Sequence, residues 1–330
     1  MQEITREALI QEAAARLRSG TVDRVLGWQR GIFAYDVTPA VFHSEEELKE
    51  KFVWNDFCGA NFSKYLVRET RKNDRKVMVF LKPCDTYSFN QLLTEHALDR
   101  DRVYVVGVPC AGMLDAGKIR EAAQGISSIR LMDYGIVLQT LYDGTLTLEY
   151  KDYLAERCQN CKSKKHVVYD SLLGTDGEAC ANGRFEMVER LEKMTSDERY
   201  AFWQNELSRC IRCNACRDVC PACTCEKCVF DNPSSGVENK AATDSFEEKL
   251  FHIIRAFHVA GRCTDCGECS RVCPQHIPLH LLNRKFIKDI DTFYGTYQAG
   301  EMVGGRSPLV DYAVDDPEVN TVREGEENHV

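Results

Sequence analysis

The hydrophobic pattern at the start of the chain is helical. Apolar residues recur at intervals of three and four from Ile4 to Leu17, and Gly20 follows the last of them. Glycine commonly ends a helix at this position, so we expect a helix between Ile4 and Gly20. Residues 45–70 are expected to be largely helical as well.

A β-α-β unit is predicted next. Residues 76–81 (KVMVFL) and 102–108 (RVYVVGV) are short apolar runs rich in valine, as buried strands are. Between them, one face of a helix is indicated at positions i, i+3, i+4, i+7 and i+8 by Phe89, Leu92, Leu93, His96 and Ala97. Asp85 precedes these residues and is expected to cap the helix. Strands joined by a crossover helix pair in parallel, which indicates an α/β domain.

The segment after this unit has the pattern of a β-hairpin. Two runs rich in β-branched and aromatic residues, within residues 135–150, are joined by Asp143-Gly144, a strong turn signal. Residues 186–207 and 245–260 then return to helical patterns. We therefore expect an α/β first half with an appended hairpin, and a mainly helical second half.

Composition and charge narrow the classes of protein that remain. The chain has 330 residues, 44% of them hydrophobic, which is enough for about two packed domains. Its net charge of −9 and the lack of a basic stripe exclude a nucleic-acid binder. No apolar run reaches the ~18 residues of a membrane span, and no secretory signal is present, so a cytoplasmic protein is expected. Residues 301–330 are expected to form an acidic, disordered tail.

Seventeen cysteines are the most unusual feature of the composition. Because the number is odd and no export signal is present, metal ligation is expected in place of a disulfide framework. The motif C-x2-C-x2-C-x3-C-P occurs twice, at residues 210–221 and 263–274. In ferredoxins with this motif, three cysteines hold one 4Fe–4S cluster and the fourth holds the other cluster of a pair. Zinc sites use two C-x2-C pairs, which a third in-phase cysteine fits poorly.

The repeated motif assigns eight cysteines to two 4Fe–4S clusters. The first cluster is predicted to be held by Cys210, Cys213, Cys216 and Cys273, and the second by Cys263, Cys266, Cys269 and Cys220. The predicted fold class is therefore an α/β N-terminal domain with a parallel β-α-β unit and an appended hairpin, plus a mainly helical dicluster ferredoxin domain. The predicted ranges are residues 1–205 for the first, 206–300 for the second and 301–330 for the tail.

A further set of cysteines is predicted at the sheet edge of the α/β domain. Cys84 follows the first predicted strand and Cys110 follows the second. The carboxyl ends of parallel strands share one edge of a sheet, where α/β folds place ligands. Cys158 and Cys161 follow the hairpin as a C-x2-C pair and complete a set of four. We expect a third 4Fe–4S cluster here, with a zinc ion or buried, unliganded cysteines as the alternatives.

Five further cysteines have no clear role. Cys223, Cys225 and Cys228 directly follow the first motif, and could bind a further metal together with Cys180 or Cys58. Because only three of them lie together, the alternative is a cysteine-rich cap packed on the ferredoxin core.

Charged residues near the motifs give weaker signals. Lys82 and Asp85 flank Cys84 and could contact a flavin or a phosphate, but a surface lysine and a helix cap are expected. His252 and His258 lie on different faces of a predicted helix and make a poor metal pair. Several arginines surround the cysteine motifs, and we expect each to be a solvated surface charge. The alternative is that they raise the cluster potential or dock an acidic partner. These residues are Arg209, Arg212, Arg217, Arg262 and Arg271.

The cysteine motifs resemble known redox families. KPCD, GVPC and Cys158-x2-Cys161 resemble the beta-subunit family of deazaflavin-reducing hydrogenases and dehydrogenases, over about residues 50–180. That resemblance implies a 4Fe–4S cluster, a flavin and reductase activity on this domain. KPCD together with a dicluster segment is also similar to the iron–sulfur subunits of anaerobic sulfite reductase and sulfhydrogenase.

The C-terminal motifs carry a second resemblance. RCIRCNACRDVCP and AGRCTDCGECSRVCP, within about residues 206–285, resemble the ferredoxin modules of subunits associated with heterodisulfide reductase and formate dehydrogenase. The hydrogenase-type beta subunits usually carry such cysteines near the N-terminus, whereas here they are C-terminal.

Together these features predict an iron–sulfur electron-transfer subunit of an anaerobic multi-subunit oxidoreductase, of the formate dehydrogenase, hydrogenase or heterodisulfide-reductase type. The expected partners are other redox subunits, with ferredoxin as a further candidate. No acid–base or nucleophilic constellation is found, so bond chemistry is expected in a partner. One alternative is a catalytic reductase subunit that binds FAD and exchanges electrons with a nicotinamide or deazaflavin coenzyme. Another is a zinc-stabilised interaction protein.

Overall fold

The computed structural model describes the chain from residue 4 to residue 316 with gaps. The described residues are 4–33, 35–72, 74–132, 135–161, 164–178, 183–232, 234, 245–311, 313–314 and 316, without the side chains of 245–248. The chain divides into two units, Met1–Arg184 and Phe185–Val330, called unit 1 and unit 2 below. Within the predicted tail, residues 312, 315 and 317–330 lie outside the described residues.

Unit 1 is built on a five-stranded sheet of order β2-β1-β3-β4-β8. The strands are β1 (Arg24–Arg30), β2 (Val37–Phe42), β3 (Val77–Leu81), β4 (Val103–Gly107) and β8 (Ser171–Leu172). β2 is antiparallel to β1, and the other four strands run parallel. Every residue of β3 is buried, as expected of a strand covered on both faces. The register from Val77–Val103 to Leu81–Gly107 brings the carboxyl ends of β3 and β4 together.

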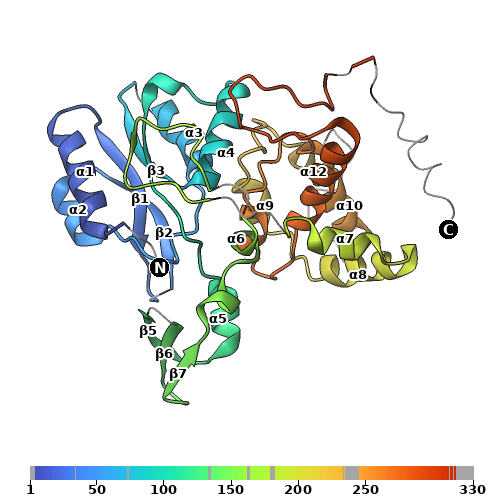
Figure 1. The fold of residues 1–330 in the computed structure, drawn as a ribbon, viewed down its shortest axis with the longest axis horizontal. Coiled ribbons are helices and arrows are strands. Elements are labelled where there is room, and N and C mark those ends of the chain that lie inside the picture. The colour runs from blue at the N-terminus through green and yellow to red at the C-terminus, as the bar shows by residue number, and fades with distance from the viewer. Residues whose placement is uncertain are drawn as a thin grey trace. The chain divides into compact units, whose positions relative to one another are not determined.

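Helices cover both faces of this sheet. The four helices are α1 (Arg6–Arg18), α2 (Glu45–Lys51), α3 (Ser63–Lys72) and α4 (Pro83–Thr94). α1 packs with α2 and α3 packs with α4, and Figure 1 shows the two pairs on opposite sides of the sheet. The core contains an aromatic cluster, in which the ring centre of Trp28 lies 4.4 Å from that of Phe62 and 4.9 Å from that of Trp54.

The predicted β-α-β unit is confirmed as β3, α4 and β4. One local expectation was wrong: Asp85 is not the N-cap of α4. The helix begins at Pro83, and Asp85, its third residue, accepts a hydrogen bond from the backbone N–H of Lys82 at 3.3 Å. Residues 45–70 form two helices, because the segment 52–62 between them leaves the helical pattern and buries Trp54 and Phe62 in the core.

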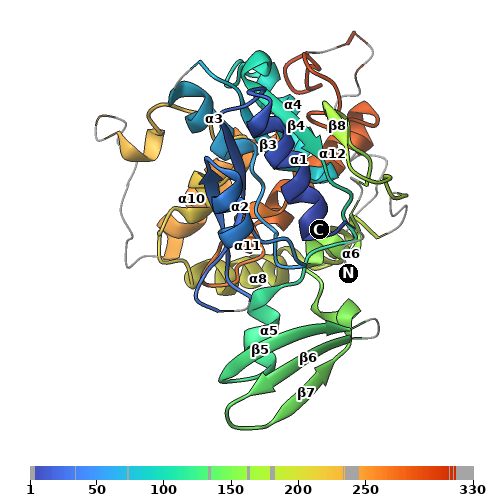
Figure 2. The same cartoon turned by 90° about the vertical axis from the view of Figure 1, so that its left-hand side faces the viewer.

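A three-stranded antiparallel sheet completes unit 1 (Figure 2). The predicted hairpin is confirmed as β6 (Gly135–Thr140) and β7 (Thr145–Leu148), and β5 (Ile126–Met132) pairs with β6. Gly144 has a φ of 72°, which glycine adopts readily in the turn. The remaining short elements of unit 1 are η1 (Arg100–Arg102), α5 (Ala116–Ala122), η2 (Tyr150–Tyr153) and α6 (Glu156–Gln159).

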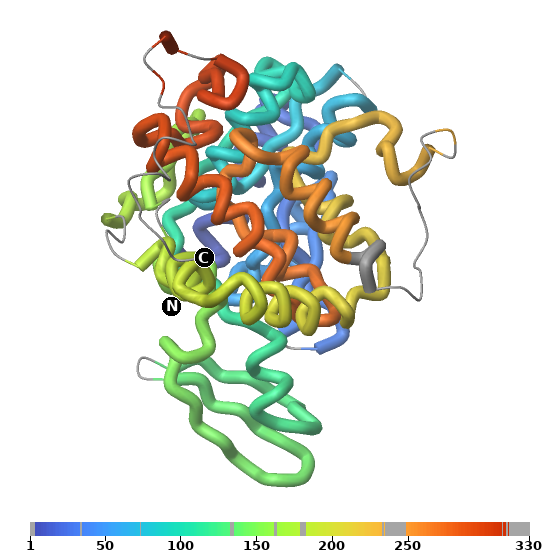
Figure 3. Tube along the Cα trace, turned by 90° about the vertical axis from the view of Figure 1, so that its right-hand side faces the viewer, coloured from blue at the N-terminus to red at the C-terminus, as the bar shows by residue number. Residues whose placement is uncertain are grey.

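Unit 2 is mainly helical, as predicted. Its elements are α7 (Glu186–Glu192), α8 (Ser196–Ser208), α9 (Ala215–Asp218), η3 (Val229–Asp231), α10 (Ser245–His258), α11 (Glu268–Arg271) and α12 (His280–Tyr294). α10 packs on α8 and α12, and α12 also packs on α7 (Figure 3). Because α7 and α8 pack on these helices, they belong to unit 2, and the division falls before α7 instead of at residue 205. No helix in the described ranges has the length and apolar character needed to cross a membrane.

The carboxyl end of β4 is a testable point of close packing. A Cβ added at Gly107 would lie 2.9 Å from Cδ1 of Leu172 and 3.1 Å from Cδ2 of His166. Gly107→Ala is therefore expected to lower the free energy of unfolding by about 1–3 kcal/mol, measured by urea denaturation. Gly177→Ala, whose nearest neighbour would be 4.0 Å away, is the control and should leave the stability unchanged. Equal stabilities of the two variants would contradict the packing described here.

Candidate metal centres

The two cysteine motifs fold into the same backbone conformation. Arg212 and Asn214 in the first motif have φ angles of 49° and 62°, and Asp265 and Gly267 at the matching positions of the second have 57° and 66°. Three of these residues are not glycine, and a left-handed conformation costs each of them about 1–2 kcal/mol. Each motif thus turns twice in the same way before α9 or α11 begins, so its first three cysteines occur in equivalent loops.

Side-chain contacts hold these turns in place. The guanidinium of Arg212 lies over the Phe251 ring, 4.1 Å from its centre, and Arg212 is largely buried. The expectation of a solvated Arg212 was therefore wrong, because α10 brings an aromatic ring over the loop. At the matching position, the carboxylate of Asp265 accepts a hydrogen bond from the buried Arg284 at 3.0 Å.

The first predicted set of four cysteines lines one cavity. The cavity has about 330 Å³ of empty space, including the solvent at its mouth, and is otherwise lined mainly by apolar side chains such as Phe251 and Ile277. Burial raises the pKa of Cys216 in its wall to about 11. The cysteines that the cavity brings together are Cys210, Cys213, Cys216 and Cys273.

The second predicted set also comes together in unit 2. Cys220, from the first motif, lies close enough to the three cysteines of the second motif for its charge to raise the pKa of each of them. Burial is the larger cause of each of these increases. The four residues are Cys220, Cys263, Cys266 and Cys269. The last cysteine of each motif thus joins the other motif's set.

The sheet edge of unit 1 brings the third predicted set together. Cys84 lies in the first turn of α4, after β3, and Cys110 follows β4. Burial, and then charge interactions with Asp85, Cys161 and Cys110, raise the pKa of the Cys84 thiol. Burial and the neighbouring Cys158 raise the pKa of Cys110 to about 12. All four cysteines are therefore linked by short-range charge interactions.

Remote backbone contacts carry Cys158 and Cys161 to this edge. Leu114, four residues after Cys110, forms an antiparallel bridge with Leu154, which directs the following α6 toward the edge. Beyond Cys161, Nε2 of the buried His166 lies 3.0 Å from the carbonyl oxygen of Leu81, at the end of β3. The segment that carries the C-x2-C pair is thus held at both ends against the sheet.

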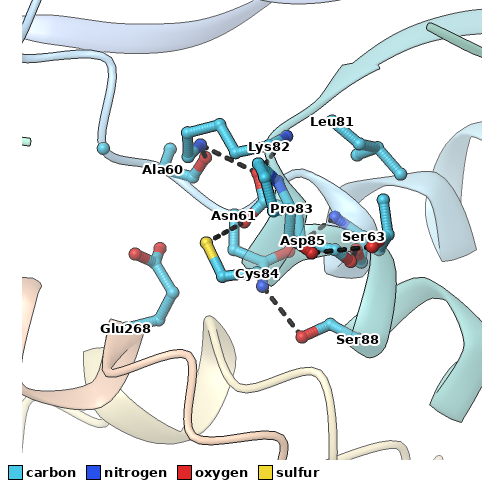
Figure 4. A network of polar contacts seen from close by, with 12 residues as sticks. Ala60, Asn61, Ser63, Leu81, Lys82, Pro83, Cys84, Asp85, Ser88 and Glu268 are labelled. Carbon is cyan, nitrogen blue, oxygen red and sulfur yellow. Dashed lines mark hydrogen bonds and ion pairs between the residues drawn. The ribbon is translucent and has the colours of Figure 1, made fainter. Parts of the chain in front are cut away.

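Lys82, beside this set, is buried, and the expectation of a surface lysine was wrong. Its side chain is 2% exposed, and its ammonium lies 2.8 Å from the Asp85 carboxylate. It also donates to the carbonyl oxygen of Ala60 at 2.8 Å (Figure 4). The ammonium lies 5.0 Å from the ring centre of Trp28. Burial alone would lower the pKa of Lys82, but Asp85 and Cys84 raise it above its ordinary value. A permanent positive charge therefore stands next to the sheet-edge cysteines.

The chemistry of the three sets fits soft, positively charged metal centres. Buried thiols with raised pKa values remain neutral unless a metal displaces their protons, and a coordinating thiol is deprotonated outright. Clusters of iron and sulfide are held by four such thiolates. Within the described ranges, no three His, Cys, Asp or Glu side chains are grouped closely enough to hold a single metal ion.

The remaining cysteines lie in different surroundings. Cys58 is fully buried in the core of unit 1, accepts a hydrogen bond from the Asn55 amide at 3.3 Å, and has its pKa raised to about 12 by burial. Cys223 packs beside Cys220 and Cys263, whereas Cys228 packs against the core around Phe251, and Cys225 is exposed. Cys180 lies outside the described residues.

Two buried residues of α10 were missed as site residues by the sequence analysis. Nε2 of His252 lies 3.2 Å from the sulfur of Cys210, and burial, with Arg255 and Arg212, lowers the pKa of His252 to about 3. Nε2 of His252 thus lies within hydrogen-bonding distance of the sulfur of Cys210, one of the predicted ligands. Arg255, three residues later, is also buried. The sequence signal that could have identified both residues is their spacing on the predicted helix, close to the apolar Phe251.

Known proteins share these features. Residues 206–277 match the family described as the 4Fe-4S dicluster domain, which confirms the predicted dicluster ferredoxin domain. The chain is 24% identical to the F420-dependent formate dehydrogenase subunit beta of Methanocaldococcus jannaschii, over 82% of this chain and 86% of that protein. It is also 24% identical to the F420-dependent formate dehydrogenase 1 subunit beta of Methanococcus maripaludis, over 65% of this chain and 71% of that one. The predicted resemblance to dehydrogenase beta subunits is thereby confirmed.

One solved structure has a partial likeness. A chain of the F420-reducing [NiFe] hydrogenase complex from Methanosarcina barkeri superimposes with a TM-score of 0.36 and 15% identity. The match covers 47% of this chain and 58% of that chain.

The buried Lys82–Asp85 pair gives a prediction for the sheet edge. Removing one partner of a buried ion pair leaves the other charge uncompensated, so Lys82→Met is expected to lower the free energy of unfolding by about 3–5 kcal/mol. The measurement is urea unfolding of anaerobically purified protein. The control is Lys49→Met, which breaks an exposed ion pair with Glu45 and should cost at most about 1 kcal/mol. A Lys82 variant as stable as the Lys49 variant would show that the pair is not buried in solution.

Proposed function

We propose that this chain is the iron–sulfur electron-transfer subunit of an anaerobic oxidoreductase complex of the formate dehydrogenase type. The observation that carries the proposal is the presence of three four-cysteine sets in one chain, two of them within a 4Fe-4S dicluster domain. The relatives that match most of the chain are formate dehydrogenase beta subunits. Formate oxidation itself is assigned to a partner subunit.

In this proposal, the cysteines hold three 4Fe–4S clusters. A bound 4Fe–4S cluster supplies one-electron redox chemistry. Cys216 and Cys220 belong to different sets, and Cys216 lies in α9 while Cys220 follows two residues after its end, which supports two centres close together in unit 2. Short separations favour electron transfer between centres. Unit 1 then holds its own centre through Cys84, Cys110, Cys158 and Cys161.

A second candidate function is that of a flavin-containing reductase subunit. The relatives are named as F420-dependent, and F420 is a deazaflavin. Deazaflavin and nicotinamide coenzymes transfer hydride, which carries two electrons, whereas a cluster accepts one. A flavin, as FAD, would connect the two kinds of step. The sheet edge of unit 1 is the proposed place, because α/β folds bind ligands at the carboxyl ends of parallel strands.

The metal content of the protein tests the three sets directly. Protein purified without oxygen is expected to contain about 12 iron atoms and as many acid-labile sulfides per chain, as three clusters require. Cys110→Ser should remove about four iron atoms, whereas Cys225→Ser, at an exposed cysteine outside the sets, should remove none. About eight iron atoms in the unaltered chain would leave the unit 1 set without a cluster. Zinc without sulfide would contradict the proposal as a whole.

The electron donor and acceptor test the type of complex. The chain, affinity-purified without oxygen from its native cells, is expected to retain partner subunits and to show bleaching of its visible absorbance on addition of formate. Reduced F420, NADH and reduced ferredoxin are added separately in the same assay, together with a flavin determination. If the protein contains bound FAD and its visible absorbance is bleached by reduced F420 or by NADH, the result would favour the flavin-containing reductase subunit. Reduction by hydrogen but not by formate would contradict the formate dehydrogenase assignment.

A further inference from the structure

Helix α10 directs two basic side chains at the cysteines of unit 2. His252 is 1% exposed and Arg255 is 4% exposed. Residues three apart lie on the same face of a helix, so both enter the same part of the core. His252 contacts the first set, through Cys210 at 3.2 Å. This helix belongs to the segment that separates the two cysteine motifs.

Arg255 contacts cysteines of both sets. Its guanidinium donates to the carbonyl oxygen of Cys216, in the first set, at 3.2 Å. It also donates to the sulfur of Cys269, in the second set, and lies close enough to Cys220 for the charge of a Cys220 thiolate to act on it. Burial alone would lower the pKa of Arg255, but Cys269 and Cys220 raise it above its ordinary value. An arginine remains protonated in any case, so a permanent cation lies between the sets.

A fixed charge in this place acts on reduction potentials. Adding one electron to a metal centre adds one negative charge, which a nearby cation stabilises more in the reduced form than in the oxidised form. The interaction is strong where protein replaces water, because the effective dielectric constant is low. Reduction potentials of iron–sulfur centres depend on net charge, on hydrogen bonds to the sulfurs and on burial, and Arg255 supplies a charge and a hydrogen bond.

We propose that Arg255 is the positioning residue that raises the reduction potentials of both 4Fe–4S centres of unit 2 together. The inference rests on the proposed function, because it requires those two centres. The centre held by the second set is affected more, since Arg255 donates directly to one of its ligand sulfurs. His252 acts on the first centre alone. One helix between the motifs thus carries a residue that acts on the reduction potentials of both centres and a residue that acts on the potential of the first centre.

The test is a redox titration followed by electron paramagnetic resonance on the full chain, purified without oxygen. In Arg255→Gln, the ratio of reduced to oxidised second-set centre at a fixed ambient potential is expected to fall at least tenfold, which is about 59 mV for one electron. The same ratio for the first-set centre should fall by less. In His252→Phe, only the ratio for the first-set centre should fall.

Two comparison variants separate charge from packing. Arg255→Lys keeps the cation, so the reduction potentials of both centres should stay near those of the unaltered chain. Arg209→Gln removes an exposed cation next to Cys210, paired with Glu206, and should shift neither centre appreciably, because water screens it. Should Arg255→Gln lose iron, Arg255→Met, which fills the same space with an apolar chain, is measured in its place.

The outcomes distinguish this inference from the proposed function. An unaltered chain without two 4Fe–4S signals from unit 2 would contradict the proposed function, and this inference with it. Two normal signals, combined with Arg255 variants that retain iron and shift no more than Arg209→Gln, would overturn this inference alone. A fall in Arg255→Lys as large as in Arg255→Gln would also overturn it, because charge would then not be the cause.

Discussion

Burying sulfur ligands in an apolar interior is the constraint on which the rest of this structure depends. A thiolate in a low-dielectric interior is costly unless a metal, a hydrogen bond or a cation offsets its charge. Four cysteines can share one metal centre only if the backbone lets their sulfurs converge, and the cysteines of one set are distant in sequence. For the proposed centres, each unit meets both requirements, the offsetting of charge and the convergence of the sulfurs, and the two units do so with different elements.

Unit 2 meets them with repeated turns and one helix. The left-handed residues Arg212, Asn214 and Asp265 curl each motif around its cysteines, at a local cost that Phe251 and Arg284 help to offset. Helix α10 supplies the aromatic packing and also the basic groups that face the sulfurs. The segment between the motifs therefore completes the surroundings of both sets.

Unit 1 meets them with a parallel sheet. β3 and β4 end side by side, which brings Cys84 and Cys110 together without any special turn. The positive charge comes from Lys82, whose place at the start of α4 is secured by Asp85 within the same turn. The C-x2-C pair is held there through backbone contacts at Leu114 and a histidine contact to β3.

The sequence by itself determined the cysteine motifs and the parallel β-α-β unit. These features follow from local spacing, because residues a few positions apart can only adopt a small number of relative placements. The exchange of the fourth cysteine joins distant residues, and was predicted from the likeness of the repeated motif to that of ferredoxins. Tertiary structure alone decided that Lys82 and Arg212 are buried, that His252 lies within hydrogen-bonding distance of Cys210 and that Arg255 lies between two sets. Burial and charge contacts depend on which distant segments pack over a residue: Trp28 and Ala60 enclose Lys82, and α10 covers both motifs. No pattern around Lys82 itself records those partners, so its burial could not be predicted from its own neighbours in the chain.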